Sequence, residues 1–238
     1  MKSCLLIVGS TSSILKDYSP AQSYDLTILC DRSTSFDQSS SKIHVHYELL
    51  NPNSNDSVLE AIGSGFDTIS IIYSSYHSHG LNRRDQYQDS LDSIGPNIVQ
   101  PLNLFSRLSS ANDQAHIRGV FISSMYAHIC PYPNNYKSEE SQNPLYYGAY
   151  KSAVEQGLRW LSVQNSLHSF NMIALGPMPK AAVYNEDPNL INALLNHLPS
   201  GTFVKPSELY STIDFLLNMN QLSIRGVSVP LDGGYSLW

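Results

Sequence analysis

Short apolar runs alternate with amphipathic stretches along most of the chain. The first run, Cys4–Val8, is unbroken and partly β-branched, which predicts a strand buried on both faces. Similar runs predict further strands at Leu26–Cys30, Ile43–His46, Thr68–Tyr73, Gly119–Ser124, Ser169–Leu175 and Val227–Leu231. Because helical stretches separate most of these runs, the pattern predicts an α/β fold, with a parallel sheet covered by helices on both faces.

Helices are predicted between these strands. The first is expected to be short, because Pro20 interrupts the segment after Val8. Longer helices are predicted at Ser54–Ile62, Arg84–Ala111, Pro144–Ser162, Asn189–Leu198 and Ser207–Leu217, the second of them bent near Gly95-Pro96 or Pro101. No change in composition marks a domain boundary, so residues 1–238 are interpreted as a single domain.

Composition and charge narrow the classes of function. Only 14% of the 238 residues are charged, the net charge is −6, and no basic run is present, so nucleic acid is not an expected partner. No apolar stretch approaches about 18 residues, so no membrane span is expected, and Cys4–Val8 is too short for a signal-peptide core. The scattered cysteines, Cys4, Cys30 and Cys130, indicate reduced thiols in a cytoplasmic protein.

Two histidines, His77 and His79, lie in the loop predicted after Tyr73. Two imidazoles can contribute to a metal site, but no cysteine or carboxylate ligands cluster near them. Polar loop residues are therefore the favoured interpretation, and no metal site is predicted.

Tyr147 and Lys151 are the first candidates for chemistry. They are four residues apart in a predicted helix and therefore share one face of it. A positive charge about 4 Å from the phenol would stabilise its anion by roughly 4 kcal/mol at an effective dielectric of about 20. We therefore expect Lys151 to lower the pKa of Tyr147 and make it a general acid or base. The alternative is a solvated helix face that carries both residues.

A serine at the end of a strand supports the chemical interpretation. Ser123 and Ser124 close the apolar run before the helix that carries Tyr147. A hydroxyl group in that position could orient a carbonyl or hydroxyl substrate beside the phenol.

A turn of small residues, beginning at Gly9, follows the first strand. Such a turn, leading into a helix, is where dinucleotide-binding domains hold a pyrophosphate. Asp31 ends the second strand about 20 positions later, where a carboxylate can bind an adenosine ribose or simply open a loop. Arg32 could instead meet a 2′-phosphate.

Together these features resemble the short-chain dehydrogenases/reductases along nearly the whole chain. Ser124, Tyr147 and Lys151 match the family's Ser, Tyr and Lys. Asn97 lies in the helix where the family keeps a catalytic Asn. The segment FNMIALGPMPK resembles its sixth-strand sequence, with Gly176-Pro177 in reversed order, and GVSVPLDGG matches its last strand. The resemblance implies a Rossmann-like doubly wound sheet in one dinucleotide-binding domain.

The resemblance also implies an enzyme that transfers a hydride between a nicotinamide and a carbonyl or alcohol carbon. Tyr147 would pass a proton to or from the substrate oxygen, and Ser124 would hydrogen-bond that oxygen. Lys151 would lower the pKa of Tyr147 and hold the nicotinamide ribose. Asn97 would hold a water that connects Lys151 to solvent.

The implied cofactor is NAD or NADP. Its site would comprise Gly9, Ser10, Ser13, Ile14, Asp31, Arg32, Ser74, Tyr147, Lys151, Gly176 and Pro177. Asp31 favours NAD slightly, because a carboxylate repels a 2′-phosphate, whereas Arg32 keeps NADP open.

The chain departs from the family pattern where the cofactor would lie. Ser13 and Leu15 hold two places of the family's three-glycine turn, and Tyr73-Ser74-Ser75-Tyr76 replaces its Asn-Asn-Ala-Gly. These changes favour an alternative from another class, a non-redox protein on the same scaffold that binds a nucleotide or a partner.

The interval between Ser124 and Tyr147 is longer than in the family's shorter members and contains Pro131 and Pro133. It resembles the extended branch that acts on nucleotide sugars, so an epimerase or dehydratase of polysaccharide biosynthesis is a further alternative. The expected partner is a small carbonyl, alcohol or sugar-type substrate, and a homo-oligomer (dimer or tetramer) is expected. Candidates for the substrate pocket are Tyr126, Tyr146 and His128, which could equally be packing or surface residues.

Overall fold

The computed structural model describes residues 1–32, 39–76, 87–138, 142–218 and 223–237. Within them, parallel strands form one seven-stranded sheet in the order β3-β2-β1-β4-β5-β6-β7. The strands are β1 (Ser3–Val8), β2 (Leu26–Asp31), β3 (Lys42–His46), β4 (Thr68–Tyr73), β5 (His116–Ile122), β6 (His168–Leu175) and β7 (Ser228–Leu231). The predicted α/β fold with a parallel sheet is confirmed. The order reverses between β1 and β4, the switch point at which such sheets bind ligands.

After β3, the helices follow the predicted order with one addition. They are α1 (Ser54–Ile62), α2 (Tyr87–Ile94), α3 (Gln100–Ala111), α4 (Leu145–Gln164), α5 (Ala181–Glu186), α6 (Pro188–Asn196) and α7 (Pro206–Leu217). A π-helix, η1 (Gly95–Val99), joins α2 to α3 at the expected bend, and the predicted start of that long helix lies outside the described residues. The short helix α5 was not predicted. The described residues also contain three 3-10 turns: η2 (Met125–Ala127), η3 (Pro133–Asn135) and η5 (Tyr235–Leu237).

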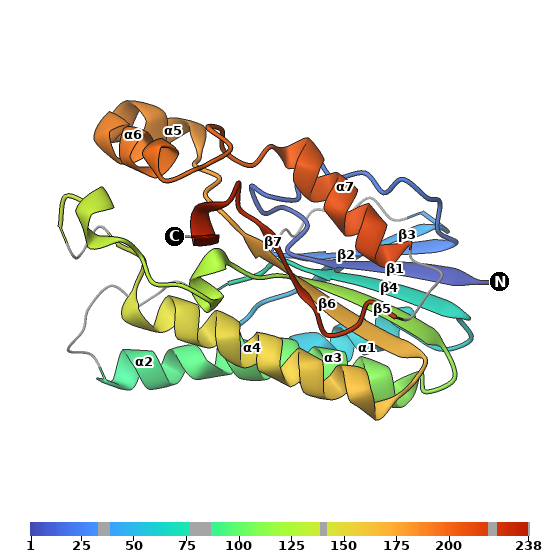
Figure 1. The fold of residues 1–238 in the computed structure, drawn as a ribbon. Coiled ribbons are helices and arrows are strands. Elements are labelled where there is room, and N and C mark those ends of the chain that lie inside the picture. Colours follow the sequence, from blue (N-terminus) through green and yellow to red (C-terminus); the bar gives the residue numbers. More distant parts are fainter. Residues whose placement is uncertain (33–38, 77–86, 139–141, 219–222, 238) are drawn as a thin grey trace.

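One face of the sheet is covered by α1, α3 and α4 (Figure 1). Val58 of α1, Leu104 of α3 and Val154 of α4 are fully buried in one apolar cluster with Leu6 and Ile71 of the sheet. Burial of each such side chain stabilises the fold by about 1.5–3 kcal/mol. This cluster holds α4 against β6, and Lys151 of α4 reaches the carbonyl of Ile122 at the end of β5.

The opposite face is covered by α7 and by the segment between β1 and β2. Here the predicted helix after the first strand is wrong, because residues 11–17 form consecutive turns. The Ser12 side chain accepts a hydrogen bond from the Leu15 amide, and Leu15 is buried in the apolar cluster of this face. Tyr210 of α7 donates to the Ile14 carbonyl at 3.1 Å, and Tyr18 donates to Asp214 of α7 at 2.7 Å. Contacts with α7 therefore fix this segment as turns.

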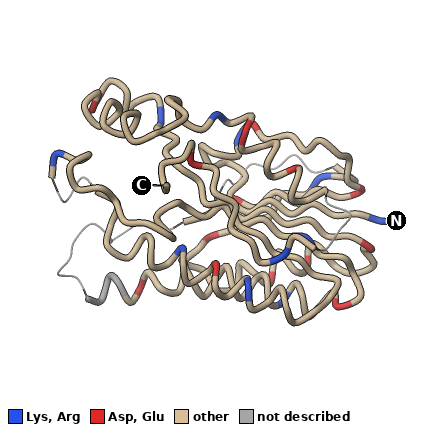
Figure 2. Tube along the Cα trace, viewed as in Figure 1, with Lys and Arg blue, Asp and Glu red and all other residues tan. Residues whose placement is uncertain are grey.

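Several short elements lie beyond the carboxyl ends of the strands. Figure 1 shows α5, α6 and the segment that follows η2 beyond this edge of the sheet, near the last described residues. Figure 2 shows charged residues scattered over the trace rather than gathered by sign. No described helix is both long and apolar enough to cross a bilayer.

Candidate functional site

A cavity of about 510 Å³ opens at the carboxyl edge of the sheet. Ser124, Tyr147 and Lys151 all line it, from the end of β5 and the first turns of α4. Gly176 and Pro177, which follow β6, line the same cavity. Ile14, Ser74, Ser75 and Tyr76 complete its inner wall. The structure thus brings together the serine, tyrosine and lysine that the sequence singled out.

The side chains of Tyr147 and Ser124 line the same cavity, and Ser124 influences the ionisation of Tyr147. Ser124 is buried and is the N-cap of η2, where its hydroxyl also accepts from the Tyr126 amide at 3.2 Å. Burial raises the pKa of Tyr147, and the nearby Ser124 hydroxyl opposes this only in part. The pKa of Tyr147 is therefore raised rather than lowered as expected, because desolvation dominates. Tyr147 is a protonated phenol at neutral pH.

The Lys151 ammonium group lies between a backbone carbonyl and aromatic rings. Its Nζ donates to the Ile122 carbonyl at 2.9 Å and lies 4.7 Å from the ring centroid of Phe121 and 6.0 Å from that of Tyr147. Burial lowers the pKa of Lys151 to about 8, although the nearby carboxylate of Glu155 acts in the opposite direction. Below that pH Lys151 keeps a charge that is enclosed by rings and one carbonyl.

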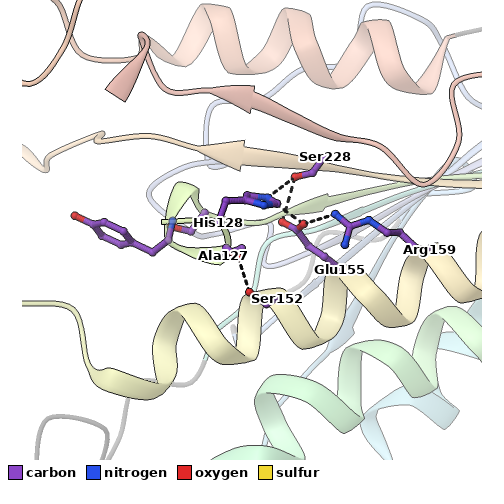
Figure 3. Close-up of polar contacts among 8 residues, drawn as sticks. Ala127, His128, Ser152, Glu155, Arg159 and Ser228 are labelled. Carbon is purple, nitrogen blue, oxygen red and sulfur yellow. Dashed lines mark hydrogen bonds and ion pairs between the residues drawn. The ribbon is translucent and has the colours of Figure 1, made fainter. Parts of the chain in front are cut away.

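Three contacts hold η2 and the residue after it to successive turns of α4. A Cβ on Gly148 would lie 2.2 Å from the Tyr126 carbonyl oxygen, so only glycine allows the two backbones to come this close. Ser152 then donates to the Ala127 carbonyl at 2.6 Å. One turn further, Nε2 of His128 lies 3.1 Å from Glu155 (Figure 3). The position of Ser124 relative to Tyr147 follows from these contacts.

Glu155 is a fully buried carboxylate with partners on three elements. Besides His128, it binds Arg159 of α4 at 2.9 Å and accepts from Ser228 of β7 at 3.2 Å (Figure 3). Figure 3 shows the His128 and Ser228 side chains converging on it from the β7 side of α4. These partners compensate a charge that would otherwise be costly to bury.

A second cavity, of about 580 Å³, adjoins the first and shares Ser74, Ser75 and Tyr76 with it. Gly9 lines it, and a Cβ there would lie 2.4 Å from the Ser74 carbonyl oxygen. Asp31 also lines it, with 6% of its surface exposed, and accepts a hydrogen bond from Ser10. The second cavity therefore lies over the switch point between β1 and β4.

Known proteins share this architecture. A short-chain dehydrogenase from Leptospira borgpetersenii with bound NAD+ superposes with a TM-score of 0.77 and 16% identity, covering 99% of this chain and 93% of that one. A 4-hydroxyisoleucine dehydrogenase complexed with NADH gives 0.77 and 16% identity, with 100% of both chains covered. An RhlG/NADP complex from Pseudomonas aeruginosa gives 0.73 and 17%, covering 99% and 96%. The fold is that of the short-chain dehydrogenases/reductases. The resemblance drawn from the sequence is confirmed.

Sequence relatives agree with this fold over part of the chain. The L-xylulose reductase of Bos taurus is 28% identical over 109 residues, which are 42% of this chain and 45% of that protein. That of Mus musculus is 27% identical over the same length. The match thus spans less than half of these curated relatives. No family model matches the chain.

The short-chain dehydrogenase/reductase fold implies a nicotinamide dinucleotide, and the two ends of the site fit one. The second cavity offers Asp31 for an adenosine ribose. In the first, the Ser123 hydroxyl is buried and has no hydrogen-bond partner among the described residues. Between them, no helix N-terminus follows Gly9, and Thr11 and Ser12 supply hydroxyl groups instead. The residues fit the two nucleosides, with a different set of groups for the diphosphate.

Several expected site residues lie elsewhere in the short-chain dehydrogenase/reductase fold. Asn97 is buried in η1, which packs against α4, but it lines neither cavity. Ser13 is exposed and Ser10 is hydrogen-bonded to Asp31, and neither residue lines the two cavities. Ile14 lines the first cavity, Arg32 lines the second, and Ser74 lines both. The positions of Ser13 and Ile14 belong to the turns that replace the predicted helix.

The residues expected in the substrate pocket are also found partly in the first cavity and partly elsewhere. Tyr126 lines the first cavity as expected, whereas Tyr146 stacks on Tyr150 and His128 binds Glu155. The sequence did not single out Tyr136, Gln142, Asn143, Met178 and Lys180, which also line it. These residues lie in the long interval before Tyr147 or just after Pro177, and that location was the sequence signal that could have identified them.

The described residues hold no group of three or more His, Cys, Asp or Glu side chains that could bind a metal. His77 and His79 lie outside the described residues. Their interpretation as loop residues stays a prediction.

Proposed function

We propose that this chain is an NAD(P)-dependent oxidoreductase that uses Tyr147 as its acid and base. The observation that carries the proposal is the convergence of Ser124, Tyr147 and Lys151 on one cavity, next to a second cavity that holds Asp31. A bound nicotinamide dinucleotide would supply or accept the hydride. Every proton and every orienting contact would come from the side chains described above.

Tyr147 acts on the substrate oxygen. Its pKa is raised by burial, so at neutral pH the phenol holds a proton that it can donate to a carbonyl oxygen as that oxygen gains charge. Ser124, which lines the same cavity, donates to the same oxygen and stabilises the developing charge. The raised pKa of Tyr147 therefore favours carbonyl reduction at neutral pH, and alcohol oxidation needs a higher pH.

Lys151 supports this chemistry from the base of the cavity. Its bond to the Ile122 carbonyl uses one of its three N–H groups, and the others remain for ribose hydroxyls and for a water held near Asn97. Its positive charge stabilises the Tyr147 anion that forms after proton donation.

The preferred substrates are small carbonyl compounds of the sugar type. Tyr136, Gln142 and Asn143 line the first cavity and offer hydroxyl and amide groups to a polyhydroxylated molecule. The relation to L-xylulose reductases supports this choice. A role in polysaccharide biosynthesis and a homo-oligomeric state stay predictions from the resemblance.

A non-redox binding protein is the second candidate. One observation favours it, the absence of the helix after Gly9 that would hold a diphosphate. Such a protein would keep the fold and bind a nucleotide or partner without turnover.

Thermal unfolding with added cofactor separates the two candidates. Binding to the native state raises the unfolding temperature, and 100-fold excess over the dissociation constant stabilises the protein by about 2.7 kcal/mol. We expect NADH or NADPH to raise the unfolding temperature at millimolar concentration, and NADH-dependent reduction of xylulose or a related sugar to follow. No shift with any nicotinamide dinucleotide would contradict the oxidoreductase and favour the binding protein.

A further inference from the structure

Tyr76 stands at the junction of the two cavities. It follows β4 in the segment Tyr73-Ser74-Ser75-Tyr76, and Ser74, Ser75 and Tyr76 are the residues that line both cavities. Any ligand that extends from Asp31 to Tyr147 must therefore pass over this short wall. Two of its three side chains are small hydroxyls, so the phenol ring of Tyr76 is its bulkiest part.

The ring of Tyr76 lies against the two residues that the proposed reaction needs. Its centroid is 4.8 Å from that of Tyr147, with an interplanar angle of 86°. Nζ of Lys151 lies 5.6 Å from the centroid of the Tyr76 ring. Tyr76 thus covers the side of this pair that faces the second cavity, where a ribose would have to reach Lys151.

The contacts that hold Tyr76 there are weak and are opposed by an unpaired polar group. Edge-to-face ring pairs and cation–π contacts each stabilise a position only modestly. The Tyr76 hydroxyl is buried and has no hydrogen-bond partner among the described residues, which disfavours the same position. The ring can therefore be displaced by a ligand, at a cost that lowers the apparent affinity of that ligand.

We propose that Tyr76 is a selectivity residue of the cleft: it leaves the adenosine cavity open to a mononucleotide and weakens ligands that extend to Lys151. The inference rests on the proposed function, because the extended ligand is a nicotinamide dinucleotide. Where the binding-competent arrangement is populated in about one molecule in ten, apparent affinity falls about tenfold. A ring that is merely part of the packing would have no such effect on one ligand relative to the other.

The test is calorimetric titration of wild type and Tyr76→Ala with AMP and with NADH. AMP reports the adenosine cavity alone, so the ratio of the two dissociation constants cancels changes that are common to both ligands. We expect Tyr76→Ala to lower the dissociation constant of NADH relative to that of AMP by about tenfold. An unchanged ratio, or NADH weakened relative to AMP, would overturn the proposal.

Three further variants keep the result interpretable. Tyr76→Phe retains the ring and should keep the wild-type ratio, whereas a gain equal to that of Tyr76→Ala would overturn the role of the ring. Tyr76→Leu keeps apolar packing in a shorter side chain and should give an intermediate gain if Tyr76→Ala does not fold. Tyr146→Ala is the matched control, since Tyr146 stacks on Tyr150, lines neither cavity and should leave the ratio unchanged.

The outcomes also separate this inference from the proposed function. NADH that binds only Tyr76→Ala would support the selectivity role while contradicting an active wild-type oxidoreductase. NADH that binds wild type and Tyr76→Ala with the same ratio to AMP would overturn the selectivity role alone. Failure of NADH to bind any variant would overturn both.

Discussion

Nε2 of His128 lies 3.1 Å from the buried carboxylate of Glu155, and this contact joins the segment after β5 to α4. Ser124 stands at one end of that segment, and Lys151 lies one helical turn before Glu155. The pair therefore links the two chain segments whose relative position decides whether Ser124 and Tyr147 can act on one oxygen.

Replacing Glu155 tests the importance of this link for stability. Glu155→Gln keeps the shape but removes the charge, so Arg159 and His128 lose a buried partner. Both are partly exposed, which reduces the loss, and we expect the free energy of unfolding to fall by about 2 kcal/mol. Urea unfolding measures it. Glu60→Gln, on an exposed position of α1, is the matched control, and equal stability of the two variants would contradict the assignment.

The buried charge of Lys151 leads us to predict how the stability of the fold depends on pH. The pKa of Lys151 falls from 10.5 to about 8 in the folded protein, so between these values the unfolded chain binds more protons. Stability from this group therefore increases as pH rises from 8 to 10.5, and below pH 8 the buried ammonium costs about 3 kcal/mol.

Lys151→Met removes that cost. We expect the variant to be more stable than wild type at pH 7 by about 1–3 kcal/mol, since loss of the bond to the Ile122 carbonyl offsets part of the gain. The difference should shrink as pH approaches 10.5. Because the other titrating groups are common to both proteins, unfolding temperatures of the pair across this range isolate Lys151. A difference that does not depend on pH would show that the ammonium is not buried as described.

Asp31 is expected to influence the preference between NADH and NADPH. Its buried carboxylate lines the second cavity, where it would repel a 2′-phosphate. We expect wild type to bind NADH more tightly than NADPH, and Asp31→Ser to shift this preference towards NADPH by about tenfold, the equivalent of roughly 1.4 kcal/mol. Titration with both cofactors measures it. Arg32→Gln is the companion variant and should weaken NADPH selectively, whereas an unchanged preference in Asp31→Ser would contradict this role.

The parts of the fold that the sequence predicted are those that depend on local pattern. The unbroken apolar run Cys4–Val8 and its equivalents mark the strands, which lie within three residues of the expected bounds, although the edge strands β3 and β7 are only partly buried. Ser124, Tyr147 and Lys151 were found because the end of a strand and the next helix are adjacent in the chain, and a helix brings residues four apart onto one face.

The parts that the sequence could not predict depend on distant contacts. Residues 11–17 form turns rather than a helix partly because Tyr18 and Ile14 bind α7, which lies about two hundred residues further along the chain. The pKa of Tyr147 was expected to be lowered, because spacing reveals the proximity of Lys151 but not the burial of the phenol. The direction of the Lys151 ammonium, towards the Ile122 carbonyl, is likewise invisible in the sequence.

Turnover by Tyr147→Phe tests the proposed function most directly. The substitution removes only the hydroxyl that carries the proton, so NADH binding and the unfolding temperature should stay close to those of wild type. With a sugar-type carbonyl compound that wild type reduces, we expect the rate of NADH consumption by Tyr147→Phe to fall to background. Turnover that persists with the same substrate in a folded, NADH-binding Tyr147→Phe protein would contradict the role of Tyr147 as the acid.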